Sequence, residues 1–121
     1  MRVMVFVKAT EAREKGIVCT PETEAMRAEM GRFNDALVAA GILKEGEGDG
    51  LQPTSAAKRI AFDGAARTVI DGPFTPARDQ VAGWWLWTVK DRAEAVAWAK
   101  RCPNPMSGPS ELEIRPCEES A

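Results

Sequence analysis

Apolar residues alternate along the start of the chain in a way that predicts a buried strand. In residues 2–8, three valines point to one side, and Met4, Phe6 and Lys8 point to the other. Since both sides are largely apolar, we expect a central strand that is covered on both faces.

Residues 83–89 show the same pattern with larger side chains. Trp85 and Trp87 lie on one face of the predicted strand, and Trp84 and Leu86 lie on the other. This strand also requires cover on both faces. Positions in the core or in a dimer interface are favoured for these tryptophans over an aromatic ligand pocket.

Apolar residues at helical spacing predict a helix over residues 22–40. They follow one another at spacings of four, three and four: Met26, Met30, Phe33 and Leu37. Thr20 and Pro21 are typical of the first positions of a helix, and Gly41 is typical of the cap that ends one.

A second helix is predicted over residues 92–102. Asp91 and Glu94 form a capping box at its start, and Pro103 stops it. The residues expected to face the core are Ala95, Val96, Ala99 and Cys102.

Turn signals predict a β-hairpin. Residues 58–62 and 66–70 flank Asp63-Gly64, a dipeptide that favours a tight turn between two strands. A final strand is expected over residues 111–115, where apolar and charged residues alternate.

The remaining stretches are polar. Residues 9–20 and 74–82 are expected to be irregular. A strand begins at residues 42–43 and passes quickly into residues 45–50, which are predicted to form a flexible loop. The glycines of that loop lack the spacing of a phosphate-binding motif.

The order of elements is β-α-β, a hairpin, and β-α-β again. This is an α+β chain of the ferredoxin-like, split βαβ type with one extra hairpin. Right-handed crossovers place both helices on one face of the sheet. A second subunit is the simplest cover for the other face, so we expect a homodimer with the architecture of a dimeric α/β barrel.

Charge and hydropathy exclude several partners. The chain has 121 residues, with 16 Lys and Arg against 18 Asp and Glu and a formal net charge of −2. Neither half is basic, which argues against nucleic-acid binding. The sequence has no polybasic block of the kind that binds a membrane surface. It also has no apolar run that approaches the ~20 residues of a membrane span. We expect one domain over residues 1–116 and a polar tail over residues 117–121.

The sequence contains no histidine. Ser-His-Asp and Cys-His catalysis are therefore excluded, as are zinc sites that need imidazole. The cysteines, Cys19, Cys102 and Cys117, form no CxxC motif, which favours reduced thiols over a disulfide framework or a metal site. We expect no metal, no cofactor and, in the absence of a signal-peptide pattern, a cytoplasmic protein.

Several segments carry a family resemblance. An Asp-Gly-Pro-Phe motif stands at residues 71–74 and is followed by the tryptophan-rich residues 83–90 and by residues 94–103. In this order and spacing, they resemble the YCII-related proteins, most closely the DGPF branch named after that motif. Residues 7–10 and 113–115 are similar too, so the resemblance spans residues 1–116.

The resemblance implies a dimeric α/β barrel and a homodimer. Relatives imply a His–Asp pair in a cleft, dehalogenating or isomerising activity in a few members, and a regulatory setting beside alternative sigma factors. Only Asp71 carries over from that pair, because the histidine is missing. The acidic residue that often follows the motif is absent from residues 75–78, where Arg78 replaces Lys.

Asp71 is the candidate catalytic residue. It is expected at a strand end beside a Gly-Pro turn, where a carboxylate partly desolvated by nearby rings can act as an acid or a base. The alternative is a structural role, in which its oxygens accept backbone N–H bonds and fix the turn.

Lys8, Ser55, Lys58 and Arg78 are the candidate ligand-binding residues. Basic side chains from a strand end, the hairpin and the following loop can converge on an anionic ligand, to which Ser55 can donate a hydrogen bond. The alternative is a solvated sheet edge whose charges maintain solubility.

Two functions of different class follow. The first is a cofactor-independent enzyme on a small anionic or aromatic molecule, in which Asp71 moves a proton and Lys8 and Arg78 hold charge. The second is a non-catalytic module that binds a small ligand or a partner protein.

Overall fold

The computed structural model describes residues 1–16 and 21–119. The predicted helix start at Thr20 and the residue Cys19 lie outside the described residues. The elements are, in chain order, β1 (Arg2–Lys8), α1 (Glu11–Glu14), α2 (Pro21–Ala39), β2 (Leu43–Gly50), the 3₁₀ turn η1 (Thr54–Ala56), β3 (Lys58–Asp63), β4 (Ala66–Asp71), the 3₁₀ turn η2 (Ala77–Asp79), β5 (Val81–Thr88), α3 (Arg92–Ala99) and β6 (Leu112–Pro116).

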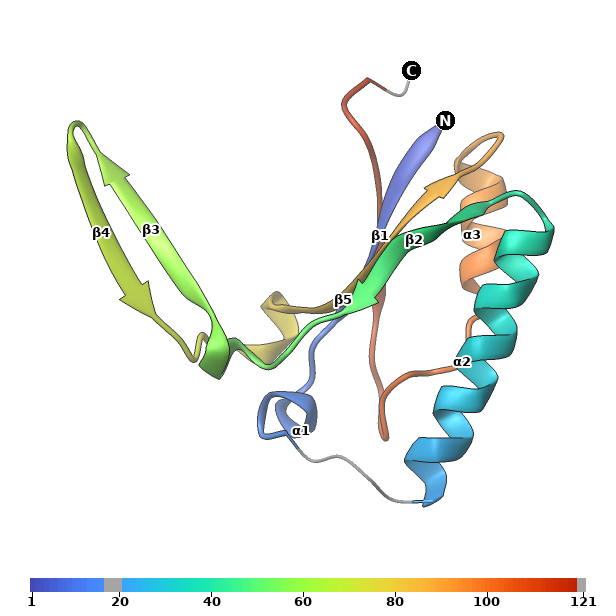
Figure 1. Ribbon diagram of the computed structural model, residues 1–121, viewed down its shortest axis with the longest axis horizontal. Coiled ribbons are helices and arrows are strands. Elements are labelled where there is room, and N and C mark those ends of the chain that lie inside the picture. Colours follow the sequence, from blue (N-terminus) through green and yellow to red (C-terminus); the bar gives the residue numbers. More distant parts are fainter. Residues whose placement is uncertain (17–20, 120–121) are drawn as a thin grey trace.

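Four strands form one antiparallel sheet in the order β2-β5-β1-β6. β1 and β5 lie at its centre, as their apolar patterns predict. Helices α2 and α3 lie on the same face of this sheet, and the β3–β4 hairpin extends to the other side (Figure 1). The chain is therefore a mixed α+β protein, compatible with the ferredoxin-like plan plus a hairpin.

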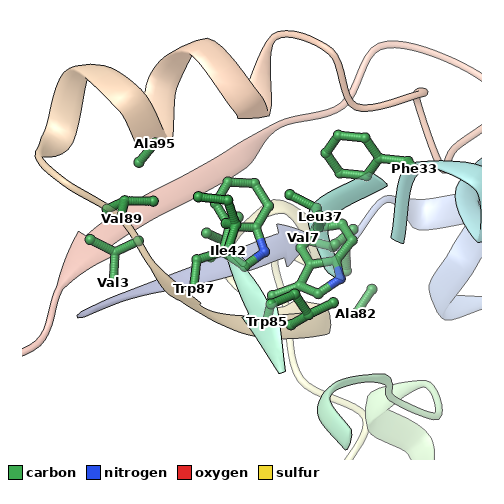
Figure 2. Close-up of a cluster of buried hydrophobic side chains, with 13 residues drawn as sticks. Val3, Val7, Phe33, Leu37, Ile42, Ala82, Trp85, Trp87, Val89 and Ala95 are labelled. Atoms are coloured by element: carbon green, nitrogen blue, oxygen red, sulfur yellow. The ribbon is translucent and has the colours of Figure 1, made fainter. Parts of the chain in front are cut away.

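The core lies between the helices and one face of the sheet (Figure 2). Trp87 is fully buried, and Trp85 is 7% exposed. The ring of Phe33 meets both indoles edge-on, at centroid distances of 6.0 Å to Trp85 and 6.3 Å to Trp87. These contacts confirm the inward face predicted for α2 and β5, because aromatic pairs prefer this edge-on geometry.

The end of α2 is capped as predicted. Gly41 has a φ of 76°, and its N–H donates to the Val38 carbonyl at 3.0 Å. The N–H of Ile42 donates to the Leu37 carbonyl at 2.9 Å, which completes a Schellman motif. The chain is thereby turned directly into β2.

The prediction of a flexible loop over residues 45–50 is wrong. The strand β2 continues through these residues to Gly50 and pairs with β5, with a register irregularity between Leu43 and Gly48. Polar side chains are tolerated there because β2 is an edge strand of the sheet.

Smaller differences concern α1, α3 and the hairpin turn. A short helix, α1, occupies part of the stretch expected to be irregular. α3 ends at Ala99 rather than at residue 102, and Val96 is 43% exposed, so its predicted inward position is wrong. Asp63 pairs with Ala66, so the tight turn consists of Gly64 and the residue after it.

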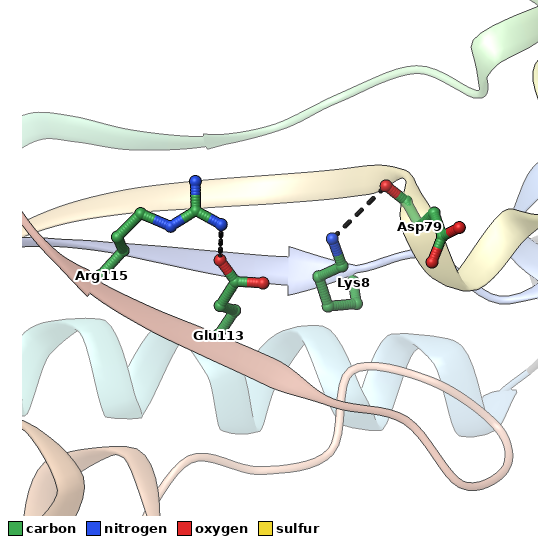
Figure 3. Close-up of polar contacts among 4 residues, drawn as sticks. All are labelled: Lys8, Asp79, Glu113 and Arg115. Atoms are coloured by element: carbon green, nitrogen blue, oxygen red, sulfur yellow. Dashed lines mark hydrogen bonds and ion pairs between the residues drawn. The ribbon is translucent and has the colours of Figure 1, made fainter.

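The sheet face opposite the helices, here called the open face, has an apolar centre. Met4 pairs with Leu86 and Phe6 pairs with Trp84 in neighbouring registers, and all four side chains are partly exposed. No helix of the described chain covers them (Figure 1). Figure 3 shows charged side chains of β6 on the same face.

No helix in the described part of the chain is both long and apolar enough to cross a membrane.

Substituting Trp87 tests the placement of the core. We expect Trp87→Ala to lower the free energy of unfolding by ~3–5 kcal/mol, since it leaves a large cavity between the sheet and α2. The matched control is Val96→Ala, which removes an exposed side chain and is expected to change that free energy by under ~1 kcal/mol. Urea unfolding followed by circular dichroism measures both. Equal effects of the two substitutions would contradict the placement.

Candidate functional site

A cleft with a volume of about 860 Å³ lies between α2 and strands β2 and β5. Apolar side chains form much of its wall, together with seven polar or charged residues. Small-molecule sites usually combine an apolar wall with polar groups that fix the orientation of the ligand. Its apolar lining comprises Val7, Met26, Met30, Val38, Ala39, Leu43, Ala82, Trp84, Trp85, Pro105 and Met106.

Trp85 forms a central part of this cleft and is held on both sides. Its indole Nε1–H donates to Asn34 Oδ1 of α2 at 2.9 Å. On the strand side, a Cβ atom at position 48 would lie 2.6 Å from Cδ1 of Trp85 and 3.0 Å from the Trp84 carbonyl oxygen. Only glycine fits at this position, so Gly48 permits the indole to lie against β2.

Arg13 reaches the cleft from α1. Thr10 caps this helix by accepting a hydrogen bond from the Arg13 backbone N–H at 3.2 Å. The Nη2 group of Arg13 donates to the Leu51 carbonyl at 3.0 Å. Its Nε–H is buried and has no hydrogen-bond partner within residues 1–16 and 21–119. A buried donor of this kind is costly and favours a ligand that brings an acceptor.

Negative charge predominates around the cleft. Two guanidinium groups, those of Arg13 and Arg27, line it against four carboxylates. The carboxylates belong to Asp35, Glu45, Glu47 and Asp49. A ligand with several negative charges is therefore disfavoured here, because like charges would face it.

A second cleft, of about 660 Å³, brings together two of the predicted ligand-binding residues, Lys8 and Arg78. The Lys8 ammonium donates to the Asp79 backbone carbonyl at 3.4 Å (Figure 3). Glu11 and Glu111 line the same cleft. The two positive charges are thus matched by two negative ones.

The other predicted site residues lie at the base of the hairpin. Lys58 Nζ and Asp71 Oδ1 are 2.6 Å apart across the first pair of the hairpin, and their side chains are 68% and 70% exposed. Ser55 is an exposed residue of η1. The predicted site residues therefore do not form one site. Lys8 and Arg78 line the second cleft, whereas Lys58 and Asp71 pair at the base of the hairpin.

The Asp-Gly-Pro-Phe motif fixes the hairpin base through its backbone. The Gly72 N–H donates to the Ala57 carbonyl at 2.9 Å. A Cβ at position 72 would lie 1.8 Å from the Thr54 carbonyl oxygen, so the two backbone segments approach too closely for any residue but glycine. The Phe74 N–H donates to Thr54 Oγ1 at 2.9 Å.

Thr54 and Glu14 complete this anchor, and sequence reasoning missed both. Thr54 is 8% exposed, and its backbone N–H and its hydroxyl both donate to the Glu14 carboxylate. The guanidinium of Arg59 lies 3.6 Å from the centroid of the Phe74 ring. These contacts join α1, η1 and the motif, although no spacing in the sequence indicates that Glu14 meets Thr54.

The thiol of Cys102 is partly buried beside the core. Burial raises the pKa of the Cys102 thiol to about 11, so it is protonated at neutral pH. Among the residues that the structure describes, no group of three or more His, Cys, Asp or Glu side chains is placed to hold a metal ion.

Comparison with known protein families agrees with this fold and with the sequence patterns. Residues 1–118 match the model of the YCII-related domain. The chain belongs to the YCII-related family. The match includes the β1–α2–β2 and β5–α3–β6 units and the hairpin between them.

A curated relative of this YCII-related chain is an uncharacterized protein of Rhizobium meliloti (strain 1021). The two are 30% identical over 66 residues, which are 54% of this chain and 53% of the relative. The aligned region therefore spans about half the length of the relative, and its description assigns no activity.

Proposed function

We propose that the protein binds a small aromatic molecule with one hydrogen-bond acceptor in the cleft between α2 and the β2–β5 edge. Two observations carry this proposal: Arg13 lines a cleft of about 860 Å³, and its buried Nε–H has no hydrogen-bond partner among the described residues. Trp85 offers aromatic surface to the ligand, and Arg13 takes its acceptor.

The charges of the cleft support the choice of an aromatic ligand over an anionic one. The four carboxylates around it outnumber the two guanidinium groups. A neutral carbonyl satisfies Arg13 without adding a negative charge beside Glu47 and Asp49. A carbonyl-bearing aromatic compound is therefore the ligand class of this proposal.

Binding without catalysis is the function that we favour. The catalytic alternative assigns proton transfer to Asp71, whose carboxylate is 70% exposed and is paired with Lys58. Catalytic acids and bases usually lie in desolvated sites, whereas the Asp71 carboxylate and the Lys58 ammonium are open to water. We propose that Asp71 anchors the hairpin and that the chain belongs to the DGPF branch, whose motif forms that anchor.

Three probes test the binding proposal: acetophenone, benzoate and benzylamine. They share an aromatic ring and carry a neutral acceptor, an anionic acceptor and a cationic donor. We expect acetophenone to bind most tightly and to shift the NMR resonance of the Trp85 indole N–H. Arg13→Met is expected to weaken its binding at least about tenfold, since it removes a hydrogen bond from a charged donor.

Two matched variants serve as controls. Arg78→Met removes a guanidinium from the second cleft, and Asp71→Asn removes the exposed carboxylate of the hairpin base. Both are expected to leave acetophenone binding within about twofold of the unmodified protein. Equal binding of the three probes, or an unaltered affinity in Arg13→Met, would argue against the proposal.

We also propose that two copies pair through the open face to form a dimeric α/β barrel. Support comes from the apolar centre formed by Met4, Phe6, Trp84 and Leu86, which the helices of the described chain leave uncovered. Interfaces commonly join an apolar centre to a charged rim. Glu113 and Arg115, which form an ion pair on this face, suit such a rim.

The dimer is tested by sedimentation equilibrium at micromolar concentration. We expect a mass twice that of the 13.1 kDa chain. Leu86→Asp is expected to shift the protein to the monomer, because it places a charge in the apolar centre. The control is Val96→Asp, which places the same charge at an exposed position of α3 on the other side of the sheet and is expected to leave the dimer intact. A stable monomer of the unmodified chain at this concentration would refute the pairing.

A further inference from the structure

The β3–β4 hairpin, here called the arm, is unusually exposed. All twelve of its strand residues are exposed, from Lys58 to Asp63 and from Ala66 to Asp71. β3 and β4 pair with each other and form a separate two-stranded sheet. A two-stranded hairpin is only marginally stable in water, so the arm needs a surface to pack against.

The arm also holds most of the exposed large hydrophobic side chains among the described residues. Four of the seven large hydrophobic side chains that are exposed belong to it. Ile60, Phe62 and Val69 are 48%, 73% and 58% exposed, and Ile70 is 43% exposed. Ile60 pairs directly with Val69, and Phe62 follows Ile60 by two residues, so these three share one face of the arm.

The total exposed area is large enough for an interface. The chain exposes 8124 Å², whereas mass scaling for compact monomers gives about 6,400 Å² at 13.1 kDa. The excess of roughly 1,700 Å² is about twice the ~800 Å² that one partner contributes to a standard interface. The extended arm and the uncovered sheet face are consistent with such an excess.

The arm and the open face lie on the same side of the molecule. In Figure 1 the helices flank one side of the sheet, and the arm projects from the other. A second copy seated on the open face therefore lies beside the arm. In a two-fold dimer the same contact occurs twice, so that both arms and both open faces are covered together.

We infer that the arm clasps the second copy of this chain, with the face formed by Ile60, Phe62 and Val69 packed against that copy. This inference rests on the proposed dimer and adds a contact outside the sheet. The anchor at the arm base supports it: the bonds from Gly72 to Ala57 and from Phe74 to Thr54 hold the arm in one direction. A pre-oriented arm loses less freedom on association.

The double variant Phe62→Ser with Val69→Ser tests the clasp. It removes exposed apolar groups and leaves the core intact, which circular dichroism checks. Because each substitution acts twice in a two-fold dimer, we expect the dimer dissociation constant to rise at least about tenfold in sedimentation equilibrium. The matched control is Ala61→Ser with Thr68→Ser, a cross-strand pair on the other face of the arm, expected to stay within about twofold.

The outcomes separate the clasp from the sheet-face pairing. If Leu86→Asp dissociates the dimer and the Phe62/Val69 variant pairs as tightly as the unmodified chain, the clasp is wrong and the pairing stands. If only the arm variant dissociates the dimer, the two copies do not pair through the open face, and both the sheet-face pairing and the clasp that rests on it are overturned. A monomeric unmodified chain refutes both.

Hydrogen exchange supplies a second readout that needs no variant. The amide groups of residues 60–69 are expected to exchange more slowly above the dimer dissociation constant than below it. The same exchange rates in monomer and dimer would overturn the clasp.

Discussion

The indole of Trp85 rests on the backbone of Gly48, and this contact joins three elements of the fold. The ring occupies the space where any other residue at position 48 would place its Cβ atom. It links β2 to β5 on the side that faces the helices, and its N–H reaches Asn34 on α2. One side chain thus joins the edge strand, the central sheet and the long helix. The same residues form one margin of the large cleft.

The second constraint is that the helices cover only one face of the sheet. The helices bury the face that carries Trp85, Trp87 and the β1 valines, and the opposite apolar face remains uncovered by the helices of the described chain. The arm extends on that same side. The cleft and the open face are therefore separate surfaces, which we propose bind a small molecule and another copy of the chain.

Residue patterns predicted the core elements because local periodicity carries that information. The alternation in β1 and β5, the apolar spacing of α2 and the glycine cap at Gly41 all agree with the structure. The extension of β2 was missed because its residues are polar and glycine-rich, and its strand conformation comes from pairing with β5. The inward position predicted for Val96 is wrong because, in the short helix α3, the neighbouring Ala95 faces the core and Val96 is exposed.

The candidate site was harder to predict, since it depends on contacts between distant segments. Arg13 enters the cleft from a helix of four residues that carries no apolar period. Glu14 meets Thr54 across 40 positions of sequence. The motif around Asp71 was recognisable, but its chief physical role is visible only in space: Gly72 lies against the Thr54 backbone.

The most direct test of this account is the binding of acetophenone to the Gly48→Ala variant, followed through the NMR resonance of the Trp85 indole N–H. The added methyl group displaces the ring from β2, so the account predicts a changed indole resonance, a weakened bond to Asn34 and at least about tenfold weaker acetophenone binding. Gly31→Ala, with open space around the added Cβ and no positive φ, is the matched control in α2 and is expected to leave both readouts unchanged. An unchanged indole resonance and unchanged binding in Gly48→Ala would contradict the central role of the Trp85–Gly48 contact.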